Sequence, residues 1–109
     1  MITVMYSPFG IEVKGHAGYA DYGEDIVCAS ISTLTQNLIW SIEDLTKDKI
    51  QYDVNAGDTV ITYRNLSEQA RLLVDSFLLG CNAVADTHPD CVRVTYMKSQ
   101  NSWGSEHGT

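Results

Sequence analysis

The stretch DIVCASISTLTQNLIWSIEDL, residues 25–45, decides the fold expected of this chain. Its apolar residues recur at spacings of three and four, which places them along one side of an α-helix. They are Val27, Ile31, Leu34, Leu38, Ile42 and Leu45. The pattern predicts a helix from about Asp25 to Leu45 that packs this stripe on a core, with Trp40 off the stripe.

Patterns of alternating apolar residues predict a β-hairpin on each side of this helix. Before it, residues 2–6 and 11–13 alternate, and Ser7-Pro8-Phe9-Gly10 between them has turn chemistry. After it, residues 50–54 alternate, residues 55–58 (NAGD) form a turn, and residues 60–63 (VITY) form the partner strand.

A second helix and a last strand complete the expected fold. Asn65 and Glu68 have the spacing of a capping box, and a second apolar stripe stops before Pro89. Its members are Ala70, Leu73, Val74, Phe77, Cys81 and Val84. Residues 92–96 alternate again. The order ββαββαβ predicts a two-layer α+β fold, a mostly antiparallel sheet covered by two helices. We expect one domain over residues 1–98 and a polar tail over residues 99–109.

Composition and charge narrow the function. The chain has 109 residues, 44% hydrophobic and 19% charged, which suits one compact domain. The net charge of -7 argues against direct nucleic-acid binding, which depends on Lys and Arg that neutralise phosphates. No apolar run approaches the roughly 20 residues of a membrane span, and the first residues show no signal-peptide pattern. We therefore expect a cytoplasmic protein that contacts no membrane.

Cysteine and histidine spacing predicts no metal site. The three cysteines lack CxxC spacing and are odd in number, so they suggest neither a zinc site nor a disulfide framework. The three histidines form no HxxxH or HExxH pattern. Cys81 lies on the second apolar stripe and is expected in the core, while Cys91 follows Pro89 and is a candidate for exposure. His88, at a helix end, is expected to be structural.

The segment GHAGYADYGEDIVCASIS, residues 15–32, carries the residues of a nucleophilic site. Cys28 is expected in the first turn of the helix, where the partial positive charge favours a thiolate. His16 is the nearby residue able to take and return a proton near neutral pH. Glycines between them let backbone approach a peptide, and loop amides there can stabilise an oxyanion.

Acidic residues in the same segment leave alternatives open. Asp25, as the N-cap, would accept a bond from the Cys28 amide and partly oppose the helix dipole. Asp21, Glu24 or Asp25 could equally orient the imidazole as a third member of the site. From the residues alone, Cys28 could also be a small core side chain and His16 a satisfied polar residue.

The string GHAGYADYGEDIVCASISTLTQ, residues 15–36, closely resembles the signature of the ribosomal-processing cysteine protease family (Prp). The resemblance implies a homodimeric α+β cysteine endopeptidase that needs no cofactor. It assigns Cys28 as the nucleophile and His16 as base and acid, a Cys/His dyad. The implied protein substrate is a large-subunit ribosomal protein, from which a short N-terminal extension is removed.

Two other functions stay open beside this one. Related proteases of phages and prophages process capsid or scaffold proteins, and the stretch from Ile31 to Val54 is closer in kind to those members. The other alternative, of a different class, is a noncatalytic peptide-binding or assembly module with Cys28 buried.

Residues around the dyad are candidates for binding or support of a substrate. Gly15, Gly18 and Tyr19 belong to the segment 15–23, which the resemblance suggests must open to admit the substrate, and Asp25 is a further candidate for support. Ser32 lies one turn after Cys28, and its hydroxyl either packs against a helix or contacts substrate. Tyr19 and Tyr22 either line a groove or pack the loop, and Trp40 is expected at a dimer contact.

Overall fold

The computed structural model describes residues 1–15 and 22–97, and it has the element order predicted from the sequence. The strands are β1 (Ile2–Ser7), β2 (Gly10–Lys14), β3 (Gln51–Asn55), β4 (Asp58–Thr62) and β5 (Val92–Tyr96). The helices are α1 (Tyr22–Leu45) and α2 (Glu68–Thr87). The α+β class, the two layers and the order ββαββαβ are thereby confirmed.

The five strands form one sheet in the order β3-β4-β2-β1-β5. The pairs β1–β2, β2–β4 and β3–β4 are antiparallel, whereas β1 and β5 are parallel. A parallel pair needs a crossover connection, and α2 supplies it by carrying the chain from β4 to β5 at the far edge. The sheet is therefore mostly antiparallel, as predicted, with one parallel pair that the strand patterns did not reveal.

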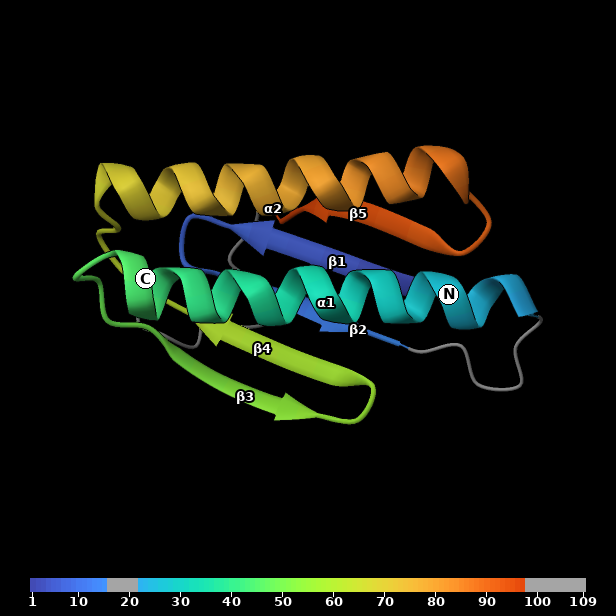
Figure 1. The fold of residues 1–109 in the computed structure, drawn as a ribbon, viewed down its shortest axis with the longest axis horizontal. Coiled ribbons are helices and arrows are strands. Elements are labelled where there is room, and N and C mark those ends of the chain that lie inside the picture. The colour runs from blue at the N-terminus through green and yellow to red at the C-terminus, as the bar shows by residue number, and fades with distance from the viewer. Residues whose placement is uncertain (16–21, 98–109) are drawn as a thin grey trace.

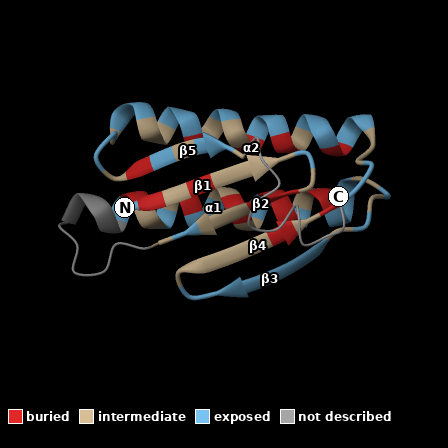
Figure 2. Cartoon of the chain, turned by 180° about the vertical axis from the view of Figure 1, so that it is seen from behind, coloured by how far each residue is buried: buried red, intermediate tan, exposed pale blue. Residues whose placement is uncertain are grey.

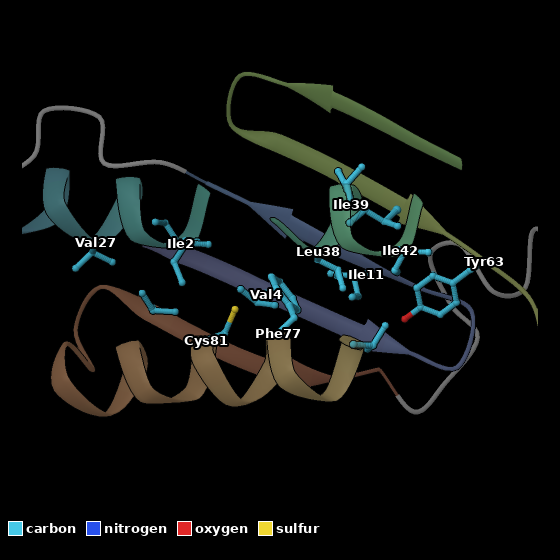
Figure 3. Packing of buried hydrophobic residues seen from close by; sticks show 14 residues of the cluster. Ile2, Val4, Ile11, Val27, Leu38, Ile39, Ile42, Tyr63, Phe77 and Cys81 are labelled. Atoms are coloured by element: carbon cyan, nitrogen blue, oxygen red, sulfur yellow. The ribbon is translucent and has the colours of Figure 1, made fainter. Parts of the chain in front are cut away.

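Both helices cover the same face of the sheet and run antiparallel to each other (Figure 1). The helices approach closely at Gly80, where a Cβ would lie 3.1 Å from Cδ2 of Leu34. The core lies between the helices and the sheet and combines residues of β1, β2, β4, β5, α1 and α2 (Figure 3). Its fully buried side chains include Val4, Ile11, Ile31, Ile42, Ile61 and Cys81.

The predicted stripe of α1 is buried at four positions, partly buried at Leu34, and wrong at its end. Val27, Ile31, Leu38 and Ile42 are buried, but Leu45 is 72% exposed. Leu45 is the last residue of the helix, and spacing alone cannot show where the covering layer stops. Ile39, off the predicted stripe, is buried because α1 packs on both the sheet and α2, so its apolar face is wider than one stripe.

The start of α2 differs from the predicted capping box. Ser67 is the N-cap, and its hydroxyl accepts a hydrogen bond from the Ala70 amide at 3.1 Å. Ser67 also donates from its own amide to the Asp48 carboxylate at 2.7 Å. Asn65 is in the left-handed region, with φ +50°, so it belongs to the preceding turn. The predicted Asn65 cap is wrong because Asn serves turns as readily as caps.

Strand β3 is the least covered part of the sheet. All five of its residues are exposed, and Figure 1 shows it beyond the edge of α1. Figure 2 shows the same strand exposed from behind.

Candidate functional site

Cys28 lies in the second turn of α1, not in the first turn as predicted. The helix begins at Tyr22, so Asp25 is its fourth residue and Cys28 its seventh. Cys28 therefore lies about 9 Å along the helix axis from the first residue of α1. The effect of a helix dipole falls off within the first turn. The argument from the helix dipole therefore does not apply at the position of Cys28. Asp25 is not the N-cap, which was one of the roles that the sequence left open for it, because the helix continues through Gly23 instead of starting after it.

A cleft of about 190 Å³ opens beside Cys28. One wall is α1, another is the end of β2, and the third is the β3–β4 hairpin. The lining residues are Val13, Gly15, Cys28, Ser32, Thr35, Gln36, Val54, Asn55, Ala56, Gly57, Asp58 and Thr59. The structure thus gathers Gly15, Cys28 and Ser32, three candidate residues of the signature, around one cleft.

Gly15 connects two walls of the cleft. Its amide donates a hydrogen bond to the Gly57 carbonyl in the β3–β4 turn, at 2.9 Å. Its φ is +100°, and a Cβ at this position would lie 2.2 Å from the carbonyl oxygen of Met1. Only glycine fits these two conditions. Gly15 therefore fixes the direction in which the chain leaves the sheet just before His16.

The β3–β4 turn is the part of the site that sequence reasoning missed. The sequence predicts a turn at residues 55–58, but the pattern carries no information on which other segment a turn lies beside. The strand order places β4 next to β2, and this pairing brings the turn to the end of β2 and to α1. A contact between segments so distant in the sequence has no local signal.

Two acidic side chains lie together on the sheet face opposite the helices. The pKa of Glu12 is raised, first by partial burial and then by hydrogen bonding to and repulsion from Asp58, while Lys14 lowers it. Lys14 pairs with Glu12 at 3.8 Å and lies opposite Asp58 in the strand register. One oxygen of Asp58, Oδ1, is buried and has no hydrogen-bond partner among the described residues. Asp58 thus belongs to both the cleft and an acidic pair behind it.

The two hydroxyls of the α1 wall have different surroundings. Thr35 is buried, and its hydroxyl donates to the Ile31 carbonyl at 2.7 Å, so it is occupied within the helix. Ser32 is exposed in the cleft wall. A peptide in the cleft would meet Ser32 before it met Thr35.

The other two cysteines have different environments from Cys28. Cys28 is half-buried in the cleft wall, whereas Cys81 is fully buried in the core, as predicted. Burial raises the pKa of the Cys81 thiol to about 12, so it stays protonated at neutral pH. Cys91 is half-buried against the core before β5 rather than fully exposed. Its carbonyl accepts a hydrogen bond from the Ile2 amide.

Several other predicted positions can be placed. His88 is the C-cap of α2 and its amide donates to the Val84 carbonyl, which fits the predicted structural role. Trp40 is 59% exposed, off the buried stripe as predicted. His16, Gly18, Tyr19 and Asp21 lie outside the described residues, as do the side chains of Tyr22, Glu24 and Asp25.

Comparison with known protein families shows to which family the chain belongs. The family model described as cysteine protease Prp matches residues 1–93. The chain belongs to the Prp family of cysteine proteases. A curated relative is the ribosomal processing cysteine protease Prp of Staphylococcus aureus, which is 29% identical over 87 residues, 77% of this chain and 82% of the relative.

Solved structures agree with the Prp fold. SMU.848 from Streptococcus mutans is 32% identical, has a TM-score of 0.69, and aligns over 88% of this chain and 91% of its own. Prp from S. aureus with a substrate peptide has a TM-score of 0.83 at 23% identity, over 89% of this chain and 100% of that one. The same protease with a covalently linked product peptide has a TM-score of 0.81 at 24% identity, with the same coverage. The two S. aureus structures show that the fold is shared.

The described residues offer neither a metal cluster nor a membrane-spanning helix. Residues 1–15 and 22–97 hold no group of three or more His, Cys, Asp or Glu side chains that could bind a metal ion. Neither α1 nor α2, the helices of the described part, is long and apolar enough to cross a membrane.

Proposed function

We propose that this Prp-family chain is an endopeptidase that removes the short N-terminal extension of a large-subunit ribosomal protein, with Cys28 as its nucleophile. One observation carries the assignment: Cys28 is half-buried and lines the wall of a cleft between α1 and the β3–β4 hairpin. Cys81, by contrast, is sealed in the core. The S. aureus relative is named for ribosomal processing, which supports the class of substrate.

The proposed reaction uses a Cys/His dyad. The Cys28 thiolate attacks the scissile carbonyl carbon and forms a tetrahedral intermediate. When the C–N bond breaks, His16 gives its proton to the leaving amine and a thioester to Cys28 remains. A water molecule, deprotonated by His16, then hydrolyses the thioester and restores the thiol. His16 enters this scheme from the family signature at residues 15–36, and no cofactor takes part in it.

Supporting roles follow from position in the cleft and in the signature. Gly15 is proposed to set the path of the chain into His16, and Ser32 to contact the bound peptide from the α1 wall. Gly18, Tyr19 and Asp25 are proposed supporting residues on the signature alone.

The net charge and an exposed tryptophan suggest the partners of the protein. The net charge of -7 favours encounter with a basic ribosomal protein, because opposite charges speed association. We also propose a cytoplasmic homodimer, with exposed Trp40 at the contact between copies.

The test is intact-mass spectrometry of an extension-bearing large-subunit ribosomal protein from the source organism, after incubation with wild-type protein. We expect one mass loss, equal to the N-terminal segment, that is absent with Cys28→Ala. Cys91→Ala is the matched control, because Cys91 is also half-buried but lies away from the cleft. It is expected to cleave like wild type.

Labelling with iodoacetamide at neutral pH separates the remaining outcomes. No cleavage with a rapidly labelled Cys28 would exclude the ribosomal substrate and turn the search to prophage capsid and scaffold proteins. No cleavage with an inert Cys28, and a Cys28→Ala variant that is destabilised, would refute the protease assignment in favour of a peptide-binding module.

A further inference from the structure

The side of β3 that faces the helix layer carries two exposed apolar residues. Tyr52 lies opposite Ile61 in the register of the β3–β4 pair, and Val54 lies opposite Thr59. Residues directly opposite each other point to the same face, and Ile61 is fully buried under the helices. Tyr52 and Val54 nevertheless remain 45% and 51% exposed. They form what we call the β3 shelf, which neither α1 nor α2 covers (Figure 1).

The β3 shelf is continuous with the cleft that holds Cys28. Val54 itself lines that cleft. Tyr52 lies two residues before Val54 on β3, on the side of the strand that leads away from the cleft. It is close to the C-terminal part of α1, because the Glu43 carboxylate raises the pKa of the Tyr52 hydroxyl. The shelf therefore leads away from Cys28 along one side of α1. A peptide leaving the cleft in this direction passes over Val54 first and over Tyr52 second.

The backbone amides and carbonyls of Tyr52 and Val54 lie at the open edge of the sheet. The β3–β4 hairpin has a two-residue loop, so its closing pair, Asn55 and Asp58, exchanges hydrogen bonds. Bonded and non-bonded pairs alternate in an antiparallel ladder, which leaves the amides and carbonyls of Val54 and Tyr52 pointing away from β4. No strand within residues 1–15 and 22–97 pairs with this edge.

We infer that the β3 shelf is a specificity site for the substrate segment next to the scissile bond. That segment lies extended along β3, with apolar side chains at two alternate positions over Val54 and Tyr52. Side chains two residues apart on a strand are roughly 6.7 Å apart, a spacing that an extended peptide shares. Edge pairing supplies affinity and alternate side chains supply selectivity in peptide recognition of this kind. The inference rests on the proposed protease function.

The occupant is the substrate rather than a second copy of the chain because the shelf begins inside the cleft. A partner that covered Val54 from another copy would also close the path to Cys28. The shelf offers apolar surface and unpaired backbone, and among residues 1–15 and 22–97 no Lys, Arg or His lines the cleft. A substrate segment with apolar side chains at positions n and n+2 fits this surface.

The experiment begins with a peptide library made from a digested proteome, cleaved by the wild-type protein and sequenced by mass spectrometry. We expect cleavage sites with apolar residues at two positions separated by one residue, on one side of the cut bond. A fluorogenic peptide spanning the best site then serves for kinetics. Tyr52→Ser and Val54→Ser should each raise KM about tenfold, with kcat within about twofold, and should lose the preference at one of the two positions.

Two further variants control for general effects. Leu79→Ser removes a leucine that is 74% exposed on α2 and away from β3, and it should leave KM unchanged. Tyr52→Leu keeps the apolar surface and should keep a KM near that of wild type. Melting temperatures near that of wild type are expected for all four variants, since each of the three side chains is about half exposed or more and none belongs to the core.

The outcomes separate the two proposals. Unchanged KM and unchanged site preference in both shelf variants would overturn the shelf while leaving the protease intact. Loss of a dimer on size-exclusion chromatography, with unchanged kinetics, would show that the β3 edge binds a second copy and would likewise overturn it. Absence of any Cys28-dependent cleavage in the library would overturn both.

Discussion

Replacement of Gly15 by alanine tests how the fold holds the start of the site. The residue has φ +100° and lies where an added Cβ would come 2.2 Å from the Met1 carbonyl oxygen. A shift of Met1 would relieve this contact, but Ile2, the next residue, is held in the sheet by hydrogen bonds. The Ile2 amide donates to the Cys91 carbonyl at 2.8 Å, and Ile2 pairs with Val92 in the sheet. Relief of the clash therefore disturbs the β1–β5 pair.

The size of the effect follows from these two costs. A non-glycine residue in a sparsely populated backbone region costs about 1–3 kcal/mol, and loss of one strand hydrogen bond costs about 0.5–1.5 kcal/mol. We expect Gly15→Ala to lower the free energy of unfolding by about 3 kcal/mol. For a domain of this size, a loss of that magnitude lowers Tm by roughly 12–24 °C.

Thermal unfolding followed by circular dichroism measures the change in Tm, and urea titration measures the change in the free energy of unfolding. Gly80→Ala is the matched control, because Gly80 is a helical glycine whose added Cβ meets only the flexible end of Leu34, at 3.1 Å. Helix propensity favours alanine there by about 1 kcal/mol, so its Tm should stay close to that of wild type. A Gly15→Ala variant that melted within about 2 °C of wild type would refute the argument from φ and the Met1 contact.

Three further predictions concern the core, the α2 cap and the buried thiol. Phe77→Ala should cost about 3–5 kcal/mol in urea unfolding, because Phe77 is 4% exposed, whereas Leu79→Ala should change stability by less than about 0.5 kcal/mol; equal losses would contradict the core assignment. Hydrogen bonds from Ser67 lower the pKa of Asp48 from its ordinary 3.8. The ionised Asp48 carboxylate therefore stabilises the fold above pH 3.8, and this stabilisation is lost as the pH falls through the lowered pKa. Asp48→Asn should therefore be less stable than wild type near neutral pH and lose less stability on acidification from about pH 5 to about pH 2, and parallel curves would disprove this. With a pKa of about 12, roughly one Cys81 in 100,000 is a thiolate at neutral pH, so peptide mapping after iodoacetamide treatment of the native protein should find Cys28 alkylated and Cys81 unmodified; comparable labelling of both would be inconsistent with the buried thiol.

The sequence alone determined the secondary-structure elements and the family of the chain. Helical spacing predicted α1 and α2, and alternation predicted all five strands, because each pattern is a direct consequence of burying one side of a local structure. The family signature at residues 15–36 is one continuous segment, so it indicated the protease family without reference to contacts between distant segments. Burial of Cys81 also followed from its place on the α2 stripe.

Only the tertiary structure decided how these elements combine around Cys28. Local patterns gave neither the parallel β1–β5 pair nor the β4–β2 pair that brings residues 55–58 to the cleft, because strand order depends on contacts between distant segments. Helix spacing also misplaced the start of α1, since Gly23 can end a helix or be included in one at a cost of about 1 kcal/mol. Exposure of Tyr52 and Val54 was likewise invisible in the sequence. Alternation shows which residues share a face, and only the packing of α1 shows that this face is left open at β3.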